Sequence, residues 1–149
     1  MRPRTWQLAA VAVLFGAAAA LAAAAVAGPR PGGGAGARTV VVTMHHSHFE
    51  PARIRVAAGE RVRFVLRNTD PIDHEFILGD AIVQARHEAG RQRRHHGDVP
   101  GERSVAAGRE AATTYAFPAA PDGTTLEFAC HLPGHYAYGM HGTVTVSAG

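Results

Sequence analysis

Beyond residue 37 the chain alternates apolar and polar residues with a period of two, which is the spacing of a β-strand that buries one of its faces. The alternation is clearest at residues 53–56 and 61–67, where aliphatic or aromatic side chains alternate with arginines. Six further strand-like segments lie at residues 40–44, 74–78, 103–105, 113–117, 126–130 and 143–146. Turn-forming Gly, Pro, Asn and Asp residues separate them. The pattern predicts an all-β fold, a Greek-key β-sandwich of seven or eight strands.

One stretch, residues 80–96, breaks this alternation. Its apolar residues are spaced for one short helix or an irregular turn, and the rest of it is rich in Arg and His. We therefore expect a helical or irregular insertion between two strands of the sandwich.

The first 27 residues have the pattern of an export signal. Arg2 and Arg4 form a charged start, an apolar run follows, and small residues at 25–27 offer a cleavage position. The apolar run of about 22 residues is also long enough to cross a bilayer, so residues 1–27 are either a signal peptide or an N-terminal membrane anchor. Both alternatives predict an exported domain that is periplasmic, secreted or membrane-anchored.

The remaining composition predicts one folded domain after a linker. Residues 28–37 are mostly Gly and Pro, which prevents regular structure, and the domain then occupies residues 38–149. About 110 residues are enough for a two-layer core. The formal net charge is +3 and every basic residue is Arg. Because no basic stripe with interleaved aromatic residues is present, we expect no nucleic-acid partner.

A single cysteine gives the first indication of chemistry. Cys130 has no internal partner for a disulfide, so in an exported chain it is buried, paired between chains or bound to a metal. His135 and Met140 follow it, with four residues in each gap, and Gly and Pro residues at 133–134 and 139 allow the loop to fold back on itself. A thiolate, two imidazoles and a weak axial thioether form the donor set that suits copper.

The second imidazole has to come from elsewhere in the chain. His74 is the best candidate, because it follows the turn at residues 71–73 and begins an apolar strand. We expect that strand to lie beside the strand that ends at Cys130.

The segment Asp73-His74-Glu75-Phe76, together with the loop from Cys130 to Met140, resembles the blue copper proteins, the cupredoxins, a family that includes plastocyanin and azurin. The resemblance covers the domain from about Arg38 to Val146, and the loop spacing is nearest to rusticyanin-like and periplasmic copper-tolerance cupredoxins. It implies a cupredoxin-like sandwich that binds one type 1 copper ion. It also implies that His74, Cys130 and His135 are the in-plane ligands and Met140 the axial one.

Other residues near these ligands have more ordinary expected roles. Many cupredoxins carry Asn or Ser after the first His, to support the Cys sulfur, but this chain has Glu75, whose side chain we expect to face away from the thiolate. His131 should point to the opposite face of its strand, in a surface or supporting position and not as a ligand. Tyr136 and Tyr138 are expected to pack at the rim of the site, and His141 to be exposed.

Six more histidines form two groups that one copper site does not require. They are His45, His46 and His48 near the first strand, and His87, His95 and His96 in the insertion. They are either solvated loop residues or ligands of a second, more exposed copper or zinc ion, because neutral imidazole suits both metals.

The leading functional prediction is one-electron transfer outside the cytoplasm, by a monomer whose partner, a cytochrome or an oxidase, contacts the edge of His135. The alternative is a periplasmic copper-tolerance protein that sequesters copper or passes it to a copper-handling partner, and the surplus of histidines and Glu75 favour it. An oxidase is the least favoured hypothesis. His46 and His48 form the single His-x-His pair of the chain, and Ala129 stands before Cys130, where the family's oxidases have His. We therefore expect no catalytic residues and no enzyme activity.

Overall fold

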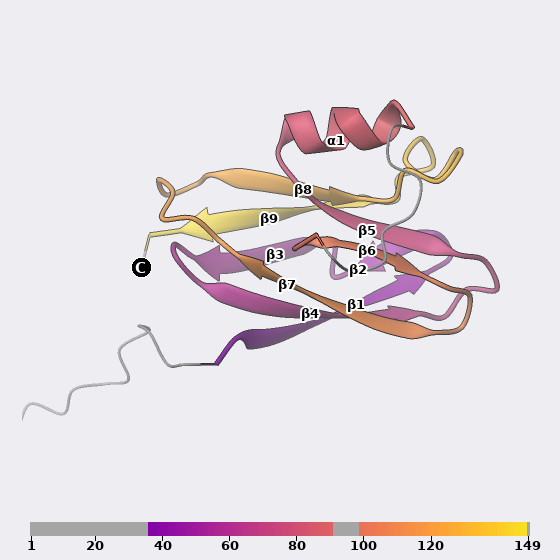
Figure 1. The fold of residues 1–149 in the computed structure, drawn as a ribbon, viewed down its shortest axis with the longest axis horizontal. Helices are drawn as coiled ribbons and strands as arrows, with labels where there is room; N and C mark the ends of the chain where they lie inside the picture. The colour runs from indigo at the N-terminus through magenta and orange to yellow at the C-terminus, as the bar shows by residue number, and fades with distance from the viewer. Residues whose placement is uncertain (1–35, 91–98, 149) are drawn as a thin grey trace, which may run out of the picture. The chain divides into compact units, whose positions relative to one another are not determined.

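The computed structural model describes residues 36–90 and 99–148, and these residues fold into the predicted sandwich of two β-sheets (Figure 1). The predicted leader at residues 1–27 lies outside the described residues, as do His95 and His96. Within residues 36–90 and 99–148, no helix combines the length and the apolar character needed to cross a membrane.

The first sheet has four strands in the order β2-β1-β4-β7. Their bounds are His48–Glu50 for β2, Arg38–His45 for β1, Arg61–Asn68 for β4 and Glu110–Ala116 for β7. Strands β1 and β4 are parallel, and the other pairs of this sheet are antiparallel. The arginines of β4 lie on its exposed face, and Val62, Phe64 and Leu66 lie on the buried face, as the alternation predicted.

The second sheet has five strands in the order β3-β9-β8-β5-β6. Their bounds are Arg53–Ala57 for β3, His141–Ser147 for β9, Thr125–Ala129 for β8, His74–Gly79 for β5 and Glu102–Val105 for β6. The described part of the chain therefore has nine strands, counting the three-residue β2 in a stretch expected to be a turn. All six residues of β5 are buried, because strands flank it on both sides and a helix covers it.

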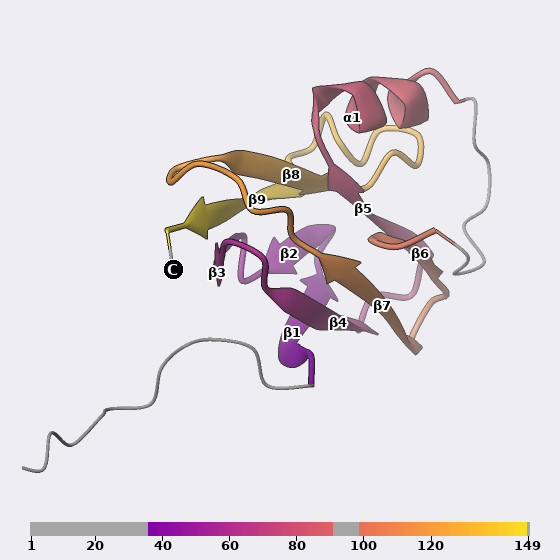
Figure 2. The same cartoon turned by 60° about the vertical axis from the view of Figure 1, so that its left-hand side comes forward.

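That helix, α1, spans Ala81–Glu88 and is the helical part of the predicted insertion (Figure 2). The carboxylate of Asp80 begins it by accepting the amides of Ile82 and Val83, both at 3.0 Å. Gln84 fixes it to the sheet, because its amide nitrogen donates to the carbonyls of Ile77 in β5 and Glu127 in β8 at 3.1 and 2.8 Å. The helix therefore lies on β5, which begins at His74, and on β8, which is followed directly by Cys130.

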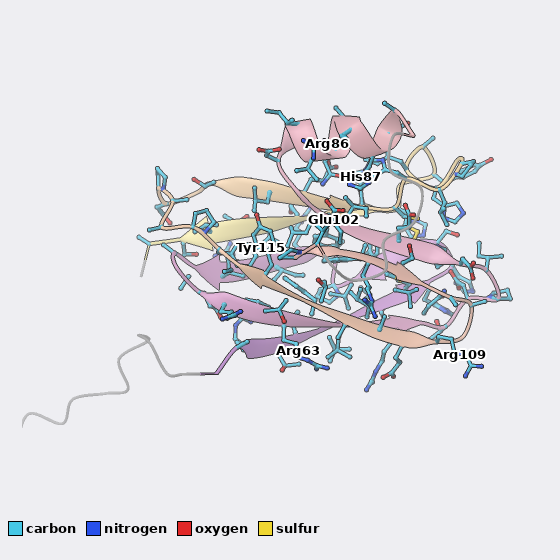
Figure 3. All side chains as sticks on the ribbon, viewed as in Figure 1. Arg63, Arg86, His87, Glu102, Arg109 and Tyr115 are labelled. Carbon is cyan, nitrogen blue, oxygen red and sulfur yellow. The ribbon has the colours of Figure 1, made fainter. Side chains whose placement is uncertain are left out.

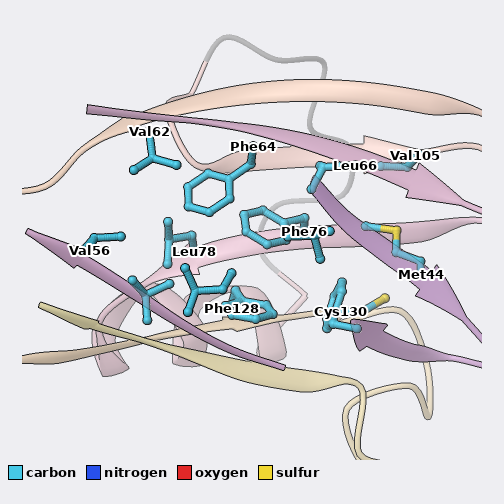
Figure 4. Close-up of a cluster of buried hydrophobic side chains, with 14 of the residues drawn as sticks. Met44, Val56, Val62, Phe64, Leu66, Phe76, Leu78, Val105, Phe128 and Cys130 are labelled. Atoms are coloured by element: carbon cyan, nitrogen blue, oxygen red, sulfur yellow. The ribbon is translucent and has the colours of Figure 1, made fainter. Parts of the chain in front are cut away.

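Aromatic rings fill the space between the sheets (Figure 4). Phe76 of β5 is fully buried, with its ring centroid 5.2 Å from those of both Phe64 and Phe128. Phe49 meets Phe76 and Phe128 edge-on at 6.0 and 5.2 Å. Cys130 belongs to the same buried cluster, so the core continues into the predicted site.

Candidate metal centre

His74 is the first residue of β5, and its side chain is fully buried. Its Nε2 lies 2.8 Å from Oδ2 of Asp70. The other ring nitrogen, Nδ1, faces Nδ1 of His135 at 3.2 Å. A single nitrogen of His74 is thereby presented to the loop that carries the other predicted ligands.

Cys130 follows directly on β8, which pairs antiparallel with β5 through Ile77 opposite Ala129. The two strands are therefore adjacent, as expected, and they carry His74 and Cys130 to one end of the sheet. The sulfur is buried and accepts a hydrogen bond from the amide of Glu75 at 3.3 Å. It also lies 3.3 Å from Nδ1 of His135. The main chain of Glu75 therefore supplies a supporting hydrogen bond to the sulfur.

The loop from Cys130 to Met140 folds back on itself, as predicted. The amide of Cys130 donates to the carbonyl of Met140, and the amide of Met140 donates to the carbonyl of His135, both at 3.1 Å. Gly134 and Gly139 have φ values of 84° and 94°, a region that glycine adopts readily and other residues do not. Met140 is fully buried next to Cys130, whereas His135 is half-buried.

These distances fit a trigonal metal site. The ligand atoms of His74, Cys130 and His135 all lie within 4.8 Å of one another. Donors placed about 2.0 Å from an ion at 120° are about 3.5 Å apart, close to the 3.2 and 3.3 Å found here. In residues 36–90 and 99–148, these three form the one group of His, Cys, Asp and Glu residues whose ligand atoms all lie within 4.8 Å of one another.

The protein environment opposes charge on the free ligands. Burial raises the pKa of the Cys130 thiol to about 11, although the amides of Leu132 and Glu75 act in the opposite direction. Burial also lowers the pKa of His135, and the neighbouring His74 lowers it further. The site therefore favours a neutral thiol and a neutral imidazole until a cation arrives to stabilise the thiolate.

Asp70 is the residue of this site that the sequence analysis missed. Its carboxylate accepts hydrogen bonds from the amides of His46 and Ser47 at 2.7 and 2.8 Å, in addition to its contact with His74. Burial by itself raises the pKa of Asp70, but the Ser47 amide, His74 and the His46 amide together lower it to about 2. In the sequence, Asp70 is part of Asn68-Thr69-Asp70-Pro71, which has the composition of an ordinary surface turn.

Glu75 and His131 lie on the other side of these strands, next to α1. Glu75 lines a cavity of about 470 Å³ together with His87, Glu88 and His131, and burial raises the pKa of its carboxyl. His131 is held between Glu88 and Gln84 of α1 at 2.8 Å each. Both side chains therefore belong to the packing of the helix, consistent with the expectation that neither is a copper ligand.

The remaining aromatic and histidine residues lie either on the ligand loop and the strand after it or, in the case of His87, on the inner face of α1. His141 is exposed, as expected, whereas Tyr138, expected to pack at the rim of the site, is 78% exposed. Tyr136 stacks between His131 and His141 with ring centroids 5.4 and 5.1 Å away. Of the two alternatives for His87, a solvated loop residue or a ligand of a second metal, the first is wrong. It lies on the inner face of α1 with 3% exposure, and its Nε2 is 3.2 Å from Oε1 of Glu102 (Figure 3).

The first histidine group is close to the site but separate from it. His45, His46 and His48 are all exposed, and the rings of His45 and His46 lie 3.8 Å apart. Nδ1 of His45 contacts Thr69 at 2.9 Å, and Nδ1 of His48 contacts the carbonyl of His46 at 2.8 Å. A second metal at this group remains a prediction.

Known proteins with similar sequences and structures agree with this geometry. A family model described as the cupredoxin-like domain matches residues 8–146. The copper-resistant cuproprotein CopI of Pseudomonas aeruginosa is 36% identical over 142 residues, which cover 73% of this chain and 76% of that protein. CopI of Rubrivivax gelatinosus is 42% identical over 113 residues, which cover 73% of this chain and 66% of that protein.

Two solved structures extend the comparison to the fold. Auracyanin B matches with a TM-score of 0.59 at 27% identity, covering 74% of this chain and 89% of that one. Auracyanin A of Chloroflexus aurantiacus, described as a "blue" copper protein, matches with a TM-score of 0.60 at 20% identity, covering 75% of this chain and all of that one. The second likeness concerns the fold alone.

The sequence, the fold and the site thus agree. The family model spans most of the chain, including both stretches that supply the buried donors. Two imidazoles and a thiolate converge, with a buried methionine beside them, and this is the arrangement of a type 1 copper site. The chain therefore belongs to the cupredoxin-like family.

Proposed function

We propose that the chain is exported, holds one copper ion through His74, Cys130, His135 and Met140, and acts in copper tolerance outside the cytoplasm. The observation that carries the proposal is the convergence of Nδ1 of His74, Nδ1 of His135 and Sγ of Cys130 within 4.8 Å. When bound in such a site, copper exchanges one electron between its two oxidation states. The proposal is for a binding protein and not for an enzyme.

Each ligand would have its own role in binding copper, and that role follows from its burial and its contacts. Cys130 would supply the soft anionic donor, in an interior where burial limits access of water. His74 would supply a buried nitrogen whose ring is fixed by Asp70. His135 is the half-buried ligand, so its edge is the point at which a redox partner or a copper donor would reach the ion.

Copper tolerance is supported by the CopI relatives, which are copper-resistant cuproproteins and match about three quarters of this chain. One-electron transfer is the second candidate, supported by the ability of copper in such a site to change its oxidation state and by the half-buried His135. In both cases a redox or copper-handling protein would be the partner. The apolar sequence of residues 1–27 supports export, with cleavage or anchoring as the two alternatives.

A deletion strain separates the two candidate functions. Copper tolerance predicts that loss of the gene lowers the copper concentration that stops growth while respiration stays normal, and that the wild-type gene, but not Cys130→Ser, restores growth. Normal growth in copper, with impaired respiratory or photosynthetic electron flow, would favour electron transfer.

The number of copper ions bound by the purified protein tests for a second site. The protein should bind one copper per chain. A second equivalent that is lost in a variant lacking His45, His46 and His48 would show a second site.

Met140→Leu tests the axial position. We expect the variant to keep an intense visible band and to show a higher reduction potential, because the axial thioether tunes the ion more than it holds it. Met44→Leu is the matched control, since Met44 is also fully buried in the core. Voltammetry should show a shift for Met140→Leu alone, and a shift for Met44→Leu alone would contradict the ligand assignment.

Copper affinity should rise with pH. Because the Cys130 thiol has a pKa of about 11, it is protonated at neutral pH and has to lose its proton when the metal binds. The pKa of His135 is lowered, so this ring adds a second proton only in the acidic range. Between pH 7 and 9 we expect one proton released per copper in a pH-stat titration and a rise in affinity of about tenfold per pH unit. Absence of proton release would mean that the thiol is not the ligand.

A further inference from the structure

We infer that Asp70 is the positioning residue of the site, fixing the His74 ring in the metal-binding tautomer and lowering the reduction potential of the bound ion. The inference rests on the proposed function in one respect, namely that His74 is a copper ligand. It goes further by naming a carboxylate that contacts no proposed metal position and acts through the imidazole.

The contact between Asp70 and His74 determines which nitrogen carries the proton. Both oxygens of the Asp70 carboxylate accept a backbone amide hydrogen, from His46 and from Ser47, so this side chain acts as an acceptor and Nε2 of His74 is the donor at 2.8 Å. In a neutral ring Nδ1 then bears a lone pair, and it is this nitrogen that faces His135 and Cys130. Without a fixed acceptor at Nε2, the alternative tautomer would place a proton where the metal is expected.

The chain holds this carboxylate in place from several directions. The amides of His46 and Ser47 each donate to one of its oxygens, and both residues have positive φ values, 49° and 57°. Such values are uncommon for residues other than glycine, and here they aim two consecutive amides at one side chain. The amide of Asp70 itself donates to Oδ1 of Asn68 at 2.9 Å.

Asn68 links this arrangement to the rest of the sandwich. Its side-chain nitrogen lies within 3.1 Å of the carbonyls of Ile72, Val105 and Ala106. Asn68 is the last residue of β4, so the carboxylate is fixed to the first sheet while His74 belongs to the second. The contact between Asp70 and His74 therefore joins the two sheets next to the metal position.

The charge of Asp70 should act on the ion as well as on the ring. Its side chain is 6% exposed and that of His74 is fully buried, so water screens the carboxylate only weakly. A fixed negative charge stabilises Cu(II) more than Cu(I), because the oxidised ion carries one more positive charge. A backbone carbonyl could hold the same tautomer, but it would not supply this full charge. The carboxylate thus favours the oxidised form.

The test compares Asp70→Asn with Asp73→Asn. Both substitutions remove one carboxylate near His74 with little change in size, but Asp73 is exposed and contacts the amide of Ala107 instead of the imidazole. We expect Asp70→Asn to shift the ratio of Cu(I) to Cu(II) affinities towards Cu(I) by at least about tenfold, which is about 59 mV in the one-electron potential. We expect Asp73→Asn to shift it much less. Equal shifts in the two variants, or no shift in Asp70→Asn, would overturn the inference.

A second measurement needs no variant, so the test remains possible if Asp70→Asn fails to fold. Nitrogen-15 NMR of the imidazole rings of the wild-type metal-free protein should show His74 with a protonated Nε2 and an unprotonated Nδ1. The opposite tautomer would overturn the inference even if copper binds normally. If instead the tautomer is as expected and the wild-type protein gives no copper-dependent visible band, the proposed function fails and the positioning of His74 stands.

Discussion

Replacing Cys130 with Ser should abolish the intense visible absorption of the copper-loaded protein. The band is expected to arise from charge transfer between a thiolate sulfur and copper, and Cys130 is the one cysteine of the chain. A serine oxygen is a harder donor and is not ionised at neutral pH, so the soft anionic ligand is lost. Loss of partners outside the ligand shell typically costs 10–100-fold in metal affinity. Loss of this ligand should therefore lower copper affinity by more than about 100-fold.

The fold should survive this change, which makes the result interpretable. Cys130 and Ser differ by one atom in the side chain, and the amide of Glu75 that now donates to sulfur can donate to the hydroxyl. Circular dichroism of the metal-free variant should match the wild type. His141→Ala is a suitable control, because it removes an exposed imidazole next to Met140 and should leave the band intact. A band that persists in Cys130→Ser would remove the basis of the copper assignment.

The sandwich could be predicted because its strands alternate regularly. In β4, Val62, Phe64 and Leu66 occupy every second position, and the structure buries these three residues as predicted. The same reasoning placed His74 beside the strand that ends at Cys130, since one candidate ligand began an apolar strand and the other ended one. The loop to Met140 could be predicted from its spacing and its glycines. Local pattern was sufficient wherever one strand and its own turn determine the geometry.

Asp70 and His87 could not be predicted in this way because their roles depend on contacts distant in sequence. Asp70 looked like a turn residue, and its function depends on amides from the turn between β1 and β2. His87 lies on α1, at the end of the helix that precedes the Arg- and His-rich part of the insertion, so the sequence pattern grouped it with His95 and His96. It is buried because α1 packs on β5 and β8. The spacing of apolar residues within the helix does not indicate that packing.

The second large effect is expected in the core that carries the ligands. Phe76→Ala should lower the free energy of unfolding by about 3–5 kcal/mol, the usual cost of removing a buried phenylalanine. The ring is fully buried and packs between Phe64 and Phe128, one in each sheet, so its removal leaves a cavity where the sheets meet. Single domains are typically stable by 5–15 kcal/mol, so the loss is a large share of the total.

Thermal unfolding of the metal-free proteins provides the measurement. A loss of 3–5 kcal/mol should lower the midpoint by about 10 °C or more in a domain of this size. Tyr138→Ala is the matched control, because it also removes an aromatic ring but from a side chain that is 78% exposed, and it should change the midpoint little. Similar shifts in the two variants would contradict the packing described for the core.

Copper should offset part of this loss, because an ion that binds the folded state alone stabilises it by about 4 kcal/mol at a free concentration 1,000 times Kd. Phe76 is two residues from His74 on β5, and its ring packs against those of Phe64 and Phe128 in the core. Copper-loaded Phe76→Ala should therefore keep its visible band while its midpoint rises towards that of the wild-type protein. If the band were lost while the protein remained folded, core packing would itself determine the ligand geometry. The rigidity of the site would then extend beyond Asp70 and the ligand loop into the aromatic cluster.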